Sequence, residues 1–256
     1  MIETREIDLI VEAGGKVTPE YRRIESRMRE FEEIGYDRVR GMLTDALTGQ
    51  APIEELAELH ALALAVEAAG PVQKATISNA ARTAFQWGLI REYEKVARDN
   101  YEALRERFNQ AARDFTTAAA IVDPSTAPAV LVGATDKIRK AWLDGQTNSQ
   151  TLSALLRPLV LAATNAGVNI ANRDAPIGLV LNTDRLHRRQ VWDAWAEGWI
   201  ALLKLGATIE AKPLDQYTPY RETLPIQHRQ VVIGRGMTRD EAYDPEDEEY
   251  AAAQSA

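Results

Sequence analysis

Apolar residues recur at steps of mostly three and four along residues 76–119, and charged residues fill the positions between them. The apolar positions are Phe85, Leu89, Tyr93, Val96, Tyr101, Leu104, Phe108, Ala111 or Ala112, and Phe115. This spacing is the period of an α-helix that packs one face on other helices. We therefore predict a long amphipathic helix over about 76–119. At about 1.5 Å per residue it spans on the order of 60 Å and needs packing partners along most of its length.

Shorter helices are predicted before the long one. Residues 1–13 alternate weakly and fit a short strand or a helix. Thr18, Pro19 and Glu20 have the order of an N-cap, a first-turn proline and a first-turn acid, so a helix begins there and keeps its period to Leu47, with Gly35 as a weak point. A further helix begins at Pro52 and ends at Gly70 and Pro71.

The second half of the chain reads as a linker, three helices and an arm. Prolines and glycine mark residues 123–135 as the linker, and helices are expected over about 135–143 and 149–165, the second kinked at Pro158. A polar turn over 144–148 separates these two helices, and residues 167–178 read as a loop. A last helix, capped within 182–184, is stopped by Gly206. Beyond it, closely spaced prolines and glycines predict an extended arm over 207–239 with a short β-prone run, and 240–256 reads as disordered or loosely helical.

These elements predict a mainly α fold: an irregular helical bundle around the long helix, with an extended, Pro-rich C-terminal arm and an acidic tail. Three regions follow: an N-terminal helical region over 1–122, a second helical region over 123–206, and the arm and tail over 207–256. Hydrophobic residues make up 45% of the 256 residues, which is enough for a substantial core.

Charge and composition narrow the classes of partner. The formal net charge is −8, and residues 239–256 hold seven acids and one base, so the rest of the chain is close to neutral. A nucleic-acid partner is therefore not expected. The acidic tail could mimic nucleic acid or hold a basic partner, but we favour the interpretation that it is simply exposed to solvent. The chain has no cysteine, which excludes disulfides and thiolate chemistry.

The chain also lacks the sequence marks of secretion and membrane insertion. The first twelve residues have no basic region followed by an apolar core, so no signal peptide is expected. No run of 18 apolar residues is present, so no membrane span is expected either. The expected location is the cytoplasm, or a virion if the chain is of phage origin.

No motif for catalysis, cofactor binding or metal binding stands out. His60, His187 and His228 lie on different predicted elements, and no Gly-x-Ser-x-Gly elbow is present. Gly14 and Gly15 precede Lys16 without the spacing of a phosphate-binding loop. We therefore expect no catalytic, cofactor-binding or metal-binding residues and no cofactor.

Two segments are candidates for interaction. Basic residues and tryptophans follow one another at Arg185, Arg188, Arg189, Trp192, Trp195 and Trp199. They could stack nucleobases or bind an anionic surface, but we favour an apolar stripe for a core or subunit interface, with the arginines paired to acids elsewhere. The second segment is the apolar part of the arm, at Leu214, Tyr217, Tyr220, Val231, Val232 and Ile233.

The arm residues are too few for a core of their own and too apolar for a solvated linker, so we expect the arm to lie along another surface. The leading hypothesis is a non-enzymatic structural or assembly protein that self-associates or joins a larger assembly. The plan of helices plus a Pro-punctuated arm and a charged tail is similar to that of virion and other assembly proteins. The alternatives are a regulatory or nucleic-acid-associated helical module that uses Arg185, Arg188 and Arg189, and an enzyme with an unrecognised helical active site.

Overall fold

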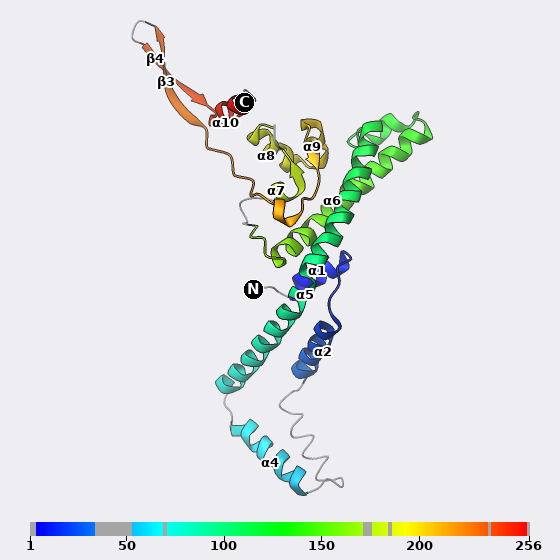
Figure 1. The fold of residues 1–256 in the computed structure, drawn as a ribbon, viewed down its shortest axis with the longest axis vertical. Helices are drawn as coiled ribbons and strands as arrows, with labels where there is room; N and C mark the ends of the chain where they lie inside the picture. Colours follow the sequence, from blue (N-terminus) through cyan, green and yellow to red (C-terminus); the bar gives the residue numbers. More distant parts are fainter. Residues whose placement is uncertain are drawn as a thin grey trace. The chain divides into compact units, whose positions relative to one another are not determined.

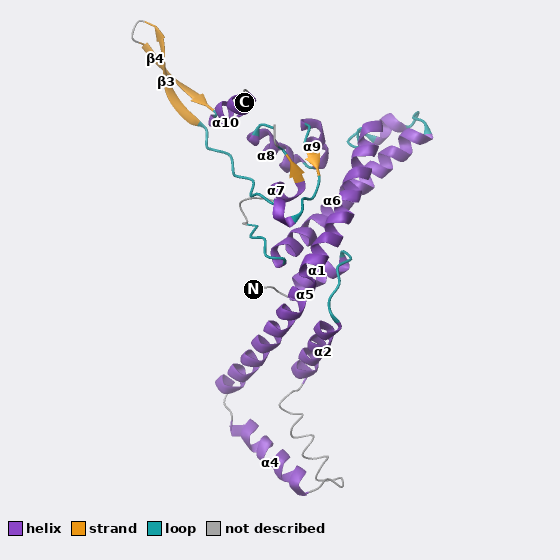
Figure 2. Cartoon of the chain, in the orientation of Figure 1, coloured by secondary structure: helices purple, strands orange, loops and turns teal. Residues whose placement is uncertain are grey.

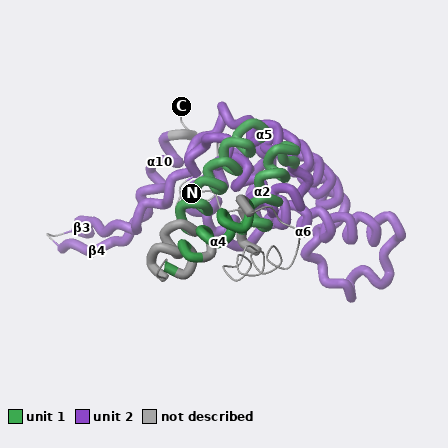
Figure 3. The backbone as a smooth tube through the Cα atoms, turned by 90° about the horizontal axis from the view of Figure 1, so that it is seen from below, with its two compact units in different colours: residues 1–4, 16–96 green, residues 5–15, 97–256 purple. Residues whose placement is uncertain are grey.

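The computed structural model describes residues 4–33, 53–68, 71–170, 176–183, 186–234 and 237–254, and the fold is mainly α, as predicted. The chain forms two compact units (Figure 3). Unit 1 consists of residues 1–4 and 16–96, and unit 2 of residues 5–15 and 97–256. The boundary between them falls within the long helix α5 (Pro71–Ile121). The three regions expected from the sequence stay a prediction.

Helix α5 confirms the stripe that predicts it. Its bounds extend the predicted range by a few residues at each end, to Pro71 and Ile121. The buried members of the stripe are Leu89, Tyr93, Tyr101, Leu104, Phe108, Ala111, Ala112 and Phe115. Phe85 and Val96 are half-buried, so the periodicity identifies the face correctly along the helix.

Unit 1 contains α2 (Pro19–Glu33), α4 (Ile53–Ala68) and the first part of α5. The predicted cap of α2 is present: the Thr18 hydroxyl accepts the Tyr21 backbone N–H at 3.0 Å and donates to Glu92 at 3.0 Å. Phe31 and Phe85 pack with their ring centroids 5.8 Å apart. The predicted continuation of this helix to Leu47, and the start of the next at Pro52, lie outside the described residues.

Unit 2 is built around the second part of α5 and α6 (Asp136–Asn165), joined by the short 3₁₀ helix η1 (Pro128–Leu131). The N-terminal segment is the helix α1 (Thr4–Glu12), which buries Ile7 and Ile10. Among the described residues, no helix is long and apolar enough to cross a lipid bilayer.

The expectation of two helices over 135–165 is wrong, because α6 runs through both the polar segment and Pro158. Gly145, which lies inside the segment predicted as a polar turn, has a packing role. A Cβ atom on Gly145 would lie 2.7 Å from Cγ of Pro124, so glycine lets the chain leaving α5 pass close to α6. Gln146 donates to the Pro124 carbonyl, and Trp142 Nε1 donates to the Thr126 carbonyl at 3.0 Å. The predicted linker is thus hydrogen-bonded to the helix that follows it.

The last predicted helix is also divided. Helix α8 (Arg188–Glu197) and helix α9 (Trp199–Leu205) are separated by Gly198, whose φ of 107° belongs to a backbone conformation that favours glycine. The N-cap of α8 is His187, so the cap expected within 182–184 is wrong, because the helix begins only at Arg188. Gly206 ends α9 in the left-handed conformation, as expected. The loop predicted over 167–178 ends inside the short helix α7 (Ile177–Val180), whose four residues are buried.

The first residues of the predicted arm belong to the core of unit 2, which corrects the expected start of the arm at residue 207. Strand β2 (Thr208–Ile209) pairs antiparallel with β1 (Leu181–Asn182). Asn109 brackets Ala211, accepting its N–H at 2.7 Å and donating to its carbonyl at 3.1 Å. The arm that leaves the core therefore begins after Lys212, whose carbonyl accepts the Tyr101 hydroxyl.

Beyond this point the arm contains a 3₁₀ turn η2 (Leu214–Gln216), strands β3 (Gln227–Gly234) and β4 (Met237–Tyr243), and helix α10 (Pro245–Gln254) (Figures 1 and 2). The β-prone run at residues 231–233 lies in β3, which pairs antiparallel with β4. The arm is thus not wholly extended, because its distal part folds into a hairpin. Within the tail predicted over 240–256, residues 245–254 take the helical alternative, whereas residues 240–243 belong to β4 and correct the prediction.

Candidate functional site

The basic start of α8 holds the acidic helix α10 through a group of ion pairs. Arg188 donates to Glu246 at 3.0 Å and to Glu249 at 2.7 Å, and Arg189 makes a two-point pair with Asp244. These pairs confirm the expectation that Arg188 and Arg189 are balanced by acids from elsewhere in the chain. Arg185 lies outside the described residues.

Two of these acids are fixed tightly. Glu246 is only 2% exposed and accepts the Leu224 backbone N–H at 2.7 Å as well as the Arg188 guanidinium. The hydrogen bonds from Arg189 lower the pKa of Asp244 from its ordinary 3.8 to about 2. Asp244 also accepts the Glu246 N–H at 3.0 Å, which caps the start of α10. We refer to residues 187–189 with Asp244, Glu246, Asp247 and Glu249 as the α8–α10 latch.

The latch contains the one group of possible metal ligands found among the described residues. Ligand atoms of His187, Asp244 and Asp247 all lie within 4.8 Å of one another, and His187 Nε2 is 2.9 Å from Asp247 Oδ1. Both carboxylate oxygens of Asp244, however, accept hydrogen bonds from Arg189. The Arg189 guanidinium already balances the charge of the Asp244 carboxylate, so ion pairing explains the group better than metal binding.

The three tryptophans do not form the single stripe predicted for them, because Gly198 places Trp199 on a different helix from Trp192 and Trp195. Trp192 holds the arm: its Nε1 donates to the Arg221 carbonyl at 3.0 Å, and its ring packs near Tyr220. Trp195 and Trp199 pack edge to face with centroids 5.6 Å apart, and Trp199 also contacts Phe108 of α5.

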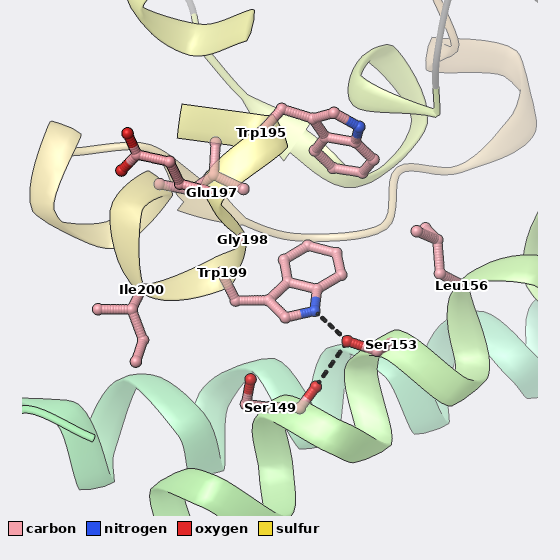
Figure 4. Close-up of a pocket in the computed structure, with 9 residues that line it drawn as sticks. Ser149, Ser153, Leu156, Trp195, Glu197, Gly198, Trp199 and Ile200 are labelled. Carbon is pink, nitrogen blue, oxygen red and sulfur yellow. Dashed lines mark hydrogen bonds between the residues drawn. The ribbon is translucent and has the colours of Figure 1, made fainter. Parts of the chain in front are cut away.

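A pocket of about 410 Å³ lies beside Trp195 and Trp199. The residues that line it are Ser149, Ser153, Leu156, Trp195, Glu197, Gly198, Trp199, Ile200 and Leu202. The Ser153 hydroxyl is satisfied locally, since it accepts from Trp199 Nε1 at 2.9 Å and donates to the Ser149 carbonyl (Figure 4). The carboxylate of Glu197 points away from the two indoles (Figure 4). The Glu197 carboxylate therefore does not face the Ser153 hydroxyl across the pocket.

The proximal arm lies against its own unit. Leu214, Tyr217 and Tyr220 are half-buried, and a Cβ atom on Gly178 would lie only 2.1 Å from the Thr218 carbonyl oxygen. The arm thus crosses α7 at backbone contact distance. These three candidate residues take part in contacts within the chain.

The hairpin is different, because nearly all of it is exposed. Val232 is 71% exposed, Ile233 56% and Met237 60%, while Val231 is half-buried. Cross-strand contacts hold the base, where the Tyr243 hydroxyl donates to Gln227 at 2.6 Å. Among the described residues singled out from the sequence as candidates for interaction, Val232 and Ile233 are exposed, whereas the others are buried or half-buried.

Sequence reasoning missed the acids of the latch. Asp244, Pro245 and Glu246 repeat the order of cap, proline and acid seen at Thr18, Pro19 and Glu20, so the start of α10 could have been recognised. Comparison of the chain with protein-family models, with curated proteins and with solved structures finds no match.

Proposed function

We propose that this chain is a non-enzymatic structural or assembly protein that contacts other protein subunits through the β3–β4 hairpin of its C-terminal arm. The observation that carries the proposal is the exposure of the hairpin on both faces. Two strands alone are at best marginally stable in water, and they gain stability when further strands or a packing surface complete them. The hairpin also exposes apolar side chains that gain from burial in a contact.

The rest of the arm supports this role by fixing the base of the hairpin. The chain enters β3 after the segment held by Trp192 and Gly178, and it leaves β4 directly into α10, which the latch ties to α8. Both ends of the hairpin are therefore anchored in unit 2. Anchoring reduces the conformational freedom that a partner would otherwise have to restrict on binding.

A helical body with an anchored, exposed hairpin suits a component of a larger assembly, such as a virion. The helical body offers less support for catalysis, because in the pocket at Trp195 and Trp199 the Glu197 carboxylate does not face the Ser153 hydroxyl. The arginine pair offers little to nucleic acid, because both guanidinium groups are already matched by carboxylates. We extend this proposal to protein partners alone.

The test is a hairpin deletion. Residues 228–242 are replaced by Asn-Gly, which closes a two-residue turn between the paired ends Gln227 and Tyr243 and leaves α10 in place. We expect the full chain to form an oligomer by light scattering and the deletion variant to be a monomer with an unchanged helical circular dichroism spectrum.

The control is a variant with Val130→Ser and Val132→Ser. These side chains are 72% and 81% exposed and lie in or beside η1, away from the arm in the sequence. Loss of association in this control would indicate non-specific association through exposed apolar side chains. Association that survives the hairpin deletion would contradict the proposed function.

A further inference from the structure

We propose that the partner of the hairpin is a second copy of this chain, and that two β3 strands pair antiparallel at their free edges to form a four-stranded sheet. This inference rests on the proposed function and names its partner. In the sheet each β3 would lie between its own β4 and the β3 of the other copy. Pairing of exposed strand edges is a common mode of protein association.

The two edges of the hairpin differ in charge. The middle of β4 holds three consecutive charged residues, Arg239, Asp240 and Glu241, and charged side chains on an edge strand oppose pairing with another chain. The distal half of β3, residues 230–234, holds no charged residue. The β3 edge is therefore the one suited to accept another strand.

Self-pairing of β3 also matches apolar residues with apolar residues. With a twofold axis at Val232, this residue faces its own copy, and Val231 faces Ile233 of the other chain. Gln230 then faces Gly234, so these five positions contain no charged residue. Aliphatic, β-branched pairs of this kind stabilise antiparallel strands.

A register irregularity lies within the segment of β3 that we propose to pair. The pairing of β3 with β4 shifts between Val232 and Gly234, so Ile233 has no cross-strand partner among the described residues of β4. Its side chain is 56% exposed. The proposed contact gives Ile233 the neighbour that the hairpin does not provide.

Symmetry separates this arrangement from the other edge pairings. A contact between two β3 strands uses the same surface on both copies and closes as a dimer. A contact between β3 of one copy and β4 of the next leaves one edge free at each step and produces an open chain of subunits. The stoichiometry of the oligomer therefore reports which edges pair.

The absence of native cysteine makes a direct cross-linking test possible. Val232 and Thr238 face each other across the hairpin, and both are exposed. In the proposed sheet the two copies of residue 232 are neighbours. The two copies of residue 238 lie three strand spacings apart, roughly 14 Å. A disulfide requires Cα atoms closer than about 7 Å.

The experiment uses the full chain with Val232→Cys or Thr238→Cys under mild oxidation. We expect Val232→Cys to give a covalent dimer at least about tenfold faster than Thr238→Cys, because residue 238 is out of reach of its copy. Light scattering of the unmodified chain should give a dimer that does not grow with concentration. Val232→Lys should make the chain monomeric, whereas Thr238→Lys should leave the dimer intact.

The outcomes separate this inference from the proposed function. If the chain associates through the hairpin but Thr238→Cys cross-links faster, or if the oligomer grows without limit, the β3 pairing is wrong and the proposed function stands. If the chain associates after the hairpin is deleted, the proposed function itself fails. A chain that stays monomeric at all concentrations overturns the second copy as partner.

Discussion

Leu104 is a completely buried residue in the middle of the face that α5 turns to the core of unit 2. Its neighbour Ala103 is exposed on the same helix. A one-residue step on a helix rotates the side chain by about 100°, which moves it from the core to solvent. These two positions test the packing of the helix with the same chemical change.

We expect Leu104→Asp to lower the free energy of unfolding by at least about 4 kcal/mol, because it removes apolar contacts and buries an unpaired charge. Ala103→Asp places the same carboxylate in solvent and should cost less than about 1 kcal/mol. Urea unfolding followed by circular dichroism measures both. Equal stabilities would show that the buried face of α5 has been assigned incorrectly.

Gly178 tests the path of the proximal arm. A methyl group at this position would meet the Thr218 carbonyl oxygen at 2.1 Å, so Gly178→Ala must push the arm away from α7. We expect a loss of about 1–3 kcal/mol, the usual cost of overpacking, together with faster proteolysis within residues 213–226. Gly133→Ala is the control, since nothing lies within 4 Å of the added atom. Unchanged proteolysis of Gly178→Ala would mean that the arm does not lie on α7.

At the scale of elements, the latch makes the docking of α10 depend on pH. The folded pKa of Asp244 is about 2, below its ordinary 3.8, so ionisation of this group favours the docked state. Its contribution is complete above the ordinary pKa and is lost as the pH falls from there toward about 2. We expect the Asp244 carboxyl carbon to titrate near pH 2 in NMR spectra, and Arg189→Ala to move that midpoint up toward the ordinary value. A midpoint that Arg189→Ala leaves unchanged would contradict the pairing.

The sequence predicted correctly the elements that depend on a few neighbouring residues. The stripe of α5, the cap at Thr18 and the stop at Gly206 each follow from a few neighbouring residues, and the structure confirms them. The polar turn predicted over 144–148 and the single last helix predicted up to Gly206 were wrong. Composition does not show that Gly145 is a packing glycine inside a helix, or that Gly198 separates two helices. The ion pairs of the latch could not be predicted from the sequence for another reason. Arg188 and Glu246 are 58 positions apart, and only the folded arm brings them together.

At the scale of the whole molecule, the latch and the hairpin form one functional unit if the proposed assembly role is correct. The latch holds α10, and α10 begins two residues after β4 ends at Tyr243. Release of α10 would free one end of the hairpin without removing any residue that contacts a partner. Association would then weaken, because binding would have to order a more mobile segment.

Reversal of the charge at Arg189 tests this coupling. Arg189→Glu faces Asp244 with a like charge and should undock α10, raising the dissociation constant of the oligomer by about tenfold or more, equivalent to about 1.4 kcal/mol. The helical body should keep its circular dichroism spectrum and its midpoint of urea unfolding. Lys137→Glu is the matched control, because it makes the same change of charge at an exposed position near the start of α6. If sedimentation equilibrium gives the same dissociation constant for both variants, the hairpin binds its partner independently of the latch, and the ion pairs serve only to cover the start of α8.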